Sequence, residues 1–173
     1  MRETKLMTWR PMELSDMLQV KALAYDIHQD YPEDEAVFRE RLRLHPAGCY
    51  SLVCGETIAG YCIAHPWCLG SVPSLNSLLN ALPVWPDTLY IHDIALAELA
   101  RGKFAAKTQI ATLAALAEQD RLPWISLTAV NGSEGFWRKN GFHASEEKQE
   151  IPGLASYGPK ALYMTRSLST APQ

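Results

Sequence analysis

The chain lacks the features that mark membrane, secreted or metal-binding proteins. No run approaches the roughly 18 consecutive apolar residues of a membrane-spanning helix, and residues 1–5 lead into a mixed polar segment without a signal-peptide core. We therefore expect a cytoplasmic protein with no membrane contact. No pair of its four cysteines has C-x-x-C spacing, which argues against a zinc site or a redox pair, and we expect no metal.

The sequence also lacks a basic balance and the common nucleotide-binding motifs. Its formal net charge is −3, which argues against nucleic acid as a partner. The pattern G-x-x-x-x-G-K-S/T is absent, which excludes a P-loop. The pattern G-x-G-x-x-G is absent too, so a dinucleotide-binding fold loses its main support.

What is present is the composition of one globular domain. The 173 residues are 47% apolar and 20% charged. No internal repeat and no Gly/Ser-rich linker divides the chain. We expect a single domain over residues 3–168, followed by a disordered tail at 169–173.

The apolar patterns predict a mixed α/β sheet with helices on both faces. Strands are expected at 6–10, 49–54, 57–65, 88–96, 124–130, from 142 onward, and at 161–166. Helices are expected in the segments that begin near residues 13 and 33, and at 103–120 and 133–140. The strand–helix–strand order over 88–130 predicts one parallel pair, and the rest of the sheet is expected to be antiparallel. Residues 66–87 are rich in proline, and an irregular excursion with a short helix at 77–81 is expected there, either as a functional segment or as a surface loop.

One candidate binding motif joins a predicted buried strand to the longest predicted helix. Its sequence is Ala-Arg-Gly-Lys-Phe-Ala-Ala, at residues 100–106. Free amides and a partial positive charge at a helix N-terminus attract phosphate, and small residues allow the backbone to approach it. Arg101 and Lys103 add positive charge. The alternative is an ordinary strand-to-helix turn with two solvated basic side chains.

A second segment, Asn-Gly-Ser-Glu-Gly-Phe-Trp-Arg-Lys-Asn-Gly-Phe at residues 131–142, predicts a short helix closed by Gly141. Alone, such a helix is more often structural than functional. Together, the two segments resemble the GNAT superfamily of acyl-CoA N-acyltransferases. The first is similar to that family's pyrophosphate loop, Q/R-x-x-G-x-G/A, and the second to its F-Y-x-x-x-G-F region. The expected order of elements agrees with the family over nearly the whole chain.

The resemblance implies an N-acetyltransferase that moves an acetyl group from acetyl-CoA to a primary amine of a small molecule or peptide by direct attack. It assigns cofactor binding to Ile94, Ala95, Leu96, Arg101, Gly102, Lys103, Phe104, Ala105, Ala106, Asn131 and Trp137. Two of these depart from the family pattern. Phe104 replaces the central glycine, so its side chain should point into the core. Trp137 replaces the tyrosine that often protonates the leaving thiolate, a role that indole cannot fill.

The catalytic assignment rests on the strand at 88–96. His92 and Asp93 are both candidates for the base, with His92 slightly favoured because imidazole titrates near neutral pH. Side chains alternate along a strand, so one of the two should face the substrate and the other the opposite side. Tyr157, Tyr163 or solvent would replace the missing acid. Tyr31, Glu33 and Trp67 are candidates for binding the acceptor amine, and each is also compatible with an ordinary packing or surface role.

Two other functions remain open at this stage. The departures at Phe104 and Trp137 favour an acyl-CoA-binding regulatory module with weak or no catalysis. A fold retained only for protein contacts is a third possibility. The resemblance is also compatible with a homodimer.

Overall fold

The computed structural model describes residues 6–102, 104–146 and 150–168. The tail expected at 169–173 lies outside these ranges. The strands are β1 (Met7–Pro11), β2 (Cys49–Cys54), β3 (Thr57–Trp67), β4 (Thr88–Leu96), β5 (Trp124–Ala129), β6 (His143–Ala144) and β7 (Leu162–Ser167). The α-helices are α1 (Met17–Ile27), α2 (Glu35–Leu44), α3 (Ala105–Gln119) and α4 (Glu134–Lys139). Short 3₁₀ turns are η1 (Leu14–Asp16), η2 (Pro46–Gly48), η3 (Glu98–Ala100) and η4 (Leu154–Tyr157).

The seven strands form one sheet in the order β1-β2-β3-β4-β5-β7-β6. Strands β4 and β5 run parallel, and the other neighbouring pairs are antiparallel. The predicted fold class, a mostly antiparallel mixed sheet with one parallel pair, is confirmed. None of the helices in the described ranges is both long and apolar enough to cross a membrane.

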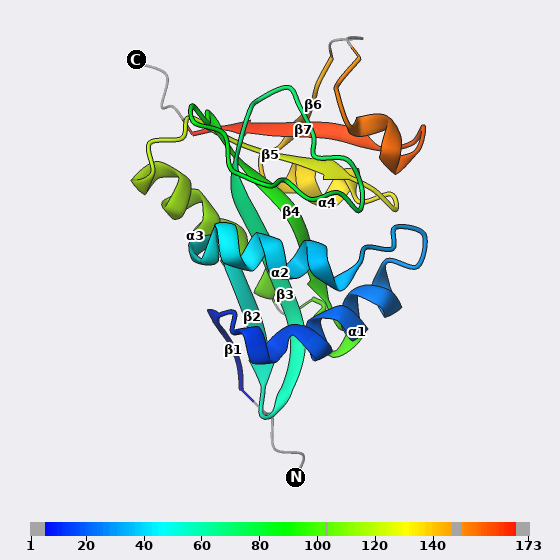
Figure 1. Ribbon diagram of the computed structural model, residues 1–173. Helices are drawn as coiled ribbons and strands as arrows, with labels where there is room; N and C mark the ends of the chain where they lie inside the picture. The colour runs from blue at the N-terminus through cyan, green and yellow to red at the C-terminus, as the bar shows by residue number, and fades with distance from the viewer. Residues whose placement is uncertain (1–5, 103, 147–149, 169–173) are drawn as a thin grey trace.

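Helices cover both faces of the sheet, and each face has its own apolar core. Leu89 and Ile91 of β4 pack with Leu113 of α3 on one face. On the other face, which α1 and α2 cross in Figure 1, Val20 and Phe38 pack on Ile63. Burial of each such side chain contributes roughly 1.5–3 kcal/mol. The central strands are therefore fixed between two layers, which gives the site a rigid base.

The helix expected at 77–81 is absent, so that prediction was wrong. Side chains of α2 bind the backbone groups that a helix would need. The Glu40 carboxylate accepts hydrogen bonds from the amides of Leu79 (2.6 Å) and Asn80 (2.9 Å). Nη2 of Arg41 donates to the carbonyl of Ser77 at 3.0 Å. The segment between β3 and β4 is therefore irregular but firmly attached to α2.

Two smaller differences concern the strands. The strand predicted at 57–65 extends through Pro66 to Trp67, and the strand from 142 onward is only two residues long, His143–Ala144. The 3₁₀ turn η4 was not predicted. It lies near the excursion, because the Val72 amide donates to the Pro152 carbonyl at 2.9 Å.

The buried pair of Glu40 and Arg41 yields a stability prediction. Nη1 of Arg41 lies 2.7 Å from Oε1 of Glu40, and the Arg41 side chain is fully buried. Glu40→Ala would leave a buried guanidinium without its carboxylate, so we expect the free energy of unfolding to fall by about 3 kcal/mol or more. Urea denaturation measures this quantity.

The matched control is Glu35→Ala on the same helix. Glu35 pairs with Arg39 one turn away, and both side chains are partly exposed. Such a pair contributes less than about 1 kcal/mol. If the free energy of unfolding fell equally in the two variants, the inference that Glu40 holds the excursion on α2 would be contradicted.

Candidate active site

The parallel pairing of β4 and β5 stops halfway along β4. It runs from Thr88 opposite Trp124 to Ile91 opposite Leu127, while β4 continues to Leu96. A cavity of about 750 Å³ lies where the two strands separate. Its other walls come from the α1–α2 connection, the excursion, α4 and η4. The end of pairing therefore opens the sheet and leaves one edge of β4 free to meet a ligand.

A register shift places two polar side chains of β4 side by side. Ile63 of β3 lies opposite Asp93 and Ala64 lies opposite Ile91, so His92 is the extra residue of a β-bulge. Both His92 and Asp93 then meet residues of the α1–α2 connection. The expectation that they point to opposite faces was wrong, because a bulge interrupts the alternation of side chains.

His92 forms a hydrogen-bonded pair with Glu33. Its Nε2 lies 2.7 Å from Oε1 of Glu33. The backbone amide of Asn76 donates to Oε2 of Glu33 at 3.0 Å. The side chains of His92 and Glu33 are only 1% and 9% exposed. Burial acts to raise the pKa of Glu33, but the charge and hydrogen bond of His92 outweigh it and lower that pKa. When the ionised Glu33 accepts the Nε2 hydrogen, Nδ1 is the ring nitrogen that remains to accept a proton.

Nδ1 of His92 is buried and has no hydrogen-bond partner among the described residues. Glu33 was expected to bind the acceptor. The structure places it in the cavity lining and against His92, where its hydrogen bond orients the ring.

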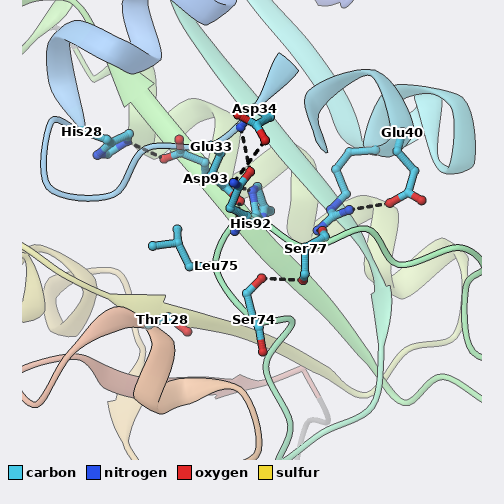
Figure 2. A network of polar contacts seen from close by, with 12 residues as sticks. His28, Glu33, Asp34, Glu40, Ser74, Leu75, Ser77, His92, Asp93 and Thr128 are labelled. Atoms are coloured by element: carbon cyan, nitrogen blue, oxygen red, sulfur yellow. Dashed lines mark hydrogen bonds and ion pairs between the residues drawn. The ribbon is translucent and has the colours of Figure 1, made fainter. Parts of the chain in front are cut away.

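Asp93 is held by a second pair of residues. His28, at the end of α1, places Nε2 at 3.0 Å from Oδ1 of Asp93. The Tyr61 hydroxyl donates to Oδ2. Both carboxylate oxygens are therefore occupied, so Asp93 is less available as a base than His92. Figure 2 shows the two pairs beside each other.

The charges of this second pair stabilise each other. Burial acts to lower the pKa of His28, but Asp93 outweighs it, and the pKa of His28 is raised. Burial acts to raise the pKa of Asp93, but His28 and Tyr61 outweigh it, and the pKa of Asp93 is lowered. Sequence reasoning missed His28, because no motif links it to a strand 65 residues away.

Two tyrosines stand across the cavity. Tyr31 of the α1–α2 connection and Tyr157 of η4 both line it, and their ring centroids are 6.2 Å apart. Burial, with the neighbouring Tyr90 and Glu33, raises the pKa of Tyr157 well above its ordinary value. Tyr157 is therefore a neutral phenol, and its raised pKa makes it a weaker proton donor than an ordinary tyrosine. The other candidate acid, Tyr163, is absent from the cavity lining, and its hydroxyl accepts the Gly70 amide at 2.9 Å.

The predicted phosphate turn connects β4 to α3. Arg101 lines the cavity, and its Nε donates to the Leu96 carbonyl at 3.2 Å. Gly102 has φ +71°, and no heavy atom lies within 4 Å of where a Cβ would be. Helix α3 begins at Ala105, so the first amides of its N-terminal turn have no intrahelical partner. The described part of the turn fits a phosphate group; Lys103 lies outside the described residues.

Phe104 does not point into the core, so that expectation was wrong. Its side chain is 75% exposed. Its backbone is left-handed, with φ +59°, at the N-cap of α3. The apolar cluster under the turn is filled by Leu52, Ala100 and Ala105 instead. The ring therefore takes no core position.

Only some of the remaining predicted residues line the cavity. Ile94, Asn131 and Trp137 line the cavity. Ala95 is buried on the face of α1 and α2. The other side chains are placed outside the cavity lining: Leu96, Ala105, Ala106 and Trp67.

Trp67, expected to bind the acceptor, packs with Val72, Tyr90 and Tyr163. Its ring meets that of His65 at right angles, with centroids 5.5 Å apart. Sequence reasoning also missed further lining residues, among them Asp26, Asp30, Leu75, Thr128 and Phe136. Among the described residues, no group of three or more His, Cys, Asp or Glu side chains is placed to hold a metal ion.

Comparison with protein families gives one assignment by sequence. The model of the acetyltransferase (GNAT) family matches residues 12–142. No curated protein sequence shows significant similarity to the chain.

Solved structures share the fold at low identity. Ard1 from Thermoplasma volcanium is 13% identical, with a TM-score of 0.69 over 95% of this chain and 99% of that one. The ribosomal-protein-S18-alanine N-acetyltransferase from Escherichia coli is 15% identical, with a TM-score of 0.62 over 97% of both chains. A GNAT family acetyltransferase from Brucella melitensis, in complex with acetyl-CoA, is 12% identical, with a TM-score of 0.61 over 98% and 93%.

The pair of His28 and Asp93 predicts a pH dependence of stability. Because the pKa of His28 is raised in the folded state, its contribution is present below the ordinary pKa of about 6.5 and is lost as the pH rises through the folded value. Asp93, with its lowered pKa, stays ionised throughout this range. The stability advantage of the wild type over His28→Gln should therefore be larger at pH 5.5 than at pH 8.5 in urea unfolding.

The control is His143→Gln, at an exposed histidine of β6 that is absent from the cavity lining. Its effect on stability should be small and should not follow this pattern. A constant difference between the wild type and His28→Gln across the pH range would contradict the ion-pair assignment.

Proposed function

This chain belongs to the acetyltransferase (GNAT) family, and on that premise we propose that it transfers an acetyl group from acetyl-CoA to a primary amine of a small molecule or peptide. One observation carries the proposal. A single cavity is lined by Arg101 of the phosphate-binding turn and by the His92–Glu33 pair. A donor bound at the turn and an amine beside His92 would thus meet in one cavity.

The donor would bind through backbone and charge. Its pyrophosphate would lie on the first amides of α3, at Ala105 and Ala106, with Arg101 supplying positive charge. Its pantetheine arm would follow the edge of β4 that β5 leaves unpaired after Ile91. A backbone amide near Ile94 would donate to the thioester oxygen and stabilise the negative charge that develops there.

Acetyl transfer is a direct attack. The neutral amine nitrogen forms a bond with the thioester carbon, and the C–S bond then breaks. Nδ1 of His92 takes the proton that the amine loses, while Glu33 holds the imidazole at Nε2. The leaving thiolate takes a proton from the Tyr157 phenol or from solvent, because the indole of Trp137 cannot supply one.

A second function is favoured by Trp137. This indole is 8% exposed and lines the cavity at the position of the family's frequent tyrosine. A module that binds acyl-CoA without efficient catalysis would retain the turn and lose the acid. Turnover with an amine library distinguishes the two functions, because only the enzyme releases free CoA in the presence of an acceptor.

Gly102→Glu should abolish acetyl-CoA binding. The change places a negative side chain beside the proposed pyrophosphate site, in space that is open in the structure. Isothermal titration with acetyl-CoA measures the loss. Gly102→Gln is the matched control, since it has the same size and the same strained positive φ but no charge. Equal affinities in the two variants would refute the role of charge at this turn.

His92→Gln should lower kcat/KM by roughly a hundredfold or more, the usual contribution of a general base. Acetyl-CoA affinity should change by less than about twofold, because the imidazole is held by Glu33 and not by the phosphate turn. The acid limb of the kcat/KM profile, which reports an essential base, should disappear. Glu33→Gln, which keeps the shape of the partner, should cause a smaller loss. A retained acid limb in His92→Gln would remove His92 as the base.

A further inference from the structure

The side chains that line the cavity are unevenly charged. Four are acidic: Asp26, Asp30, Glu33 and Asp93. Among the described lining residues the single Lys or Arg is Arg101, on the phosphate turn. The acids come from the end of α1, the α1–α2 connection and β4, the segments beside His92. The two histidines that line this end are paired with Glu33 and Asp93. This end therefore carries negative charge, and none of its described lining residues is a Lys or Arg that could neutralise an acceptor's carboxylate.

Two of these acids form no ion pair with another described side chain. Glu33 and Asp93 are paired with His92 and His28. Asp26 and Asp30 are exposed, and neither forms an ion pair within the described ranges. They are therefore free to act on a ligand that enters the cavity.

An independent observation marks where the reacting nitrogen would lie. His92 lines the same cavity, its side chain is 1% exposed, and its Nδ1 has no partner in the described part of the chain. An amine hydrogen would satisfy this atom. A ligand with one neutral amino group at His92 and a positively charged group near Asp26 and Asp30 would bind to all three of these side chains.

Contacts between loops also limit the shape of the acceptor. The rings of Tyr31 and Tyr157 meet across the cavity. The Leu75 amide donates to Oγ of Ser156 at 2.8 Å, which joins the excursion to η4. These contacts tie together the walls of this end, and they favour a compact molecule over an extended polypeptide lying across it.

We propose that the acceptor is a compact aliphatic amine that carries a second positive charge and no carboxylate, of the diamine class. The inference rests on the proposed function, since it names the substrate class of the same site. One amino group, in its neutral form, attacks the thioester. The other, as an ammonium ion, is attracted by Asp26 and Asp30.

The test uses three four-carbon amines that differ only in the distant group. They are 1,4-diaminobutane, butylamine and 4-aminobutyrate, with a positive, a neutral and a negative end. With saturating acetyl-CoA at low salt, we expect kcat/KM to fall in that order, by roughly tenfold between the first two. The difference between the amines should lie mainly in KM. It should shrink at high salt, because the carboxylates of Asp26 and Asp30 are exposed.

The double variant Asp26→Asn, Asp30→Asn should reduce the preference for 1,4-diaminobutane over butylamine to within about twofold. The control variant Glu56→Gln, Glu118→Gln changes the net charge by the same amount at exposed acids absent from the cavity lining, and should keep the preference. An unchanged preference in the first variant, or a loss in the second, would overturn the inference.

The remaining outcomes separate this inference from the proposed function. Turnover in which butylamine or 4-aminobutyrate is preferred overturns the diamine class and keeps the acetyltransferase. If no amine is acetylated, titration of the three amines into the CoA-bound protein decides. The same order of affinity supports the inference, and equal or absent binding refutes it. Failure to bind acetyl-CoA refutes the proposed function, and the inference then falls with it.

Discussion

The separation of β4 from β5 is the feature on which the site depends. Pairing ends at Ile91 opposite Leu127, and in the next residue the bulge at His92 shifts the register against β3. The first change leaves one edge of β4 unpaired, and an unpaired strand edge readily binds an extended ligand. The second change turns His92 and Asp93 toward the same helical layer. In the proposed function, one short stretch of a strand thus supplies both a surface for the donor and the polar side chains for the reaction.

Buried polar contacts, not regular structure, hold the walls of the cavity in place. The excursion between β3 and β4 has few regular backbone hydrogen bonds of its own, and Glu40 and Arg41 bind its backbone from α2. The backbone amide of Asn76 donates to Glu33 and so connects the excursion to the partner of His92. Each contact satisfies a polar group that would otherwise be costly to bury. The stability of the excursion and the orientation of His92 therefore share one network.

The sequence predicted the elements better than the contacts between them. The strands at 49–54 and 88–96 were placed at their observed ends, because continuous apolar runs between turn residues define buried strands. The bulge at His92 could not be foreseen, since it depends on a register with β3 that no local pattern encodes. His28 was missed for a similar reason, because its role depends on Asp93 across the fold. The short segment 77–81 was mispredicted because the side chains of Glu40 and Arg41 bind its backbone groups.

The exposure of Phe104 bears on how the phosphate turn tolerates a residue other than glycine. A left-handed backbone strains a bulky residue by roughly 1–3 kcal/mol, which is why glycine suits such a position. That strain lowers the free energy of unfolding and not the free energy of ligand binding, because the left-handed N-cap conformation is already present in the structure. The amides that follow at Ala105 and Ala106 are unaffected by the ring. In the proposed function, phosphate binding at this turn depends on the backbone and on Arg101, so replacement of the glycine changes the stability of the turn more than the chemistry it offers.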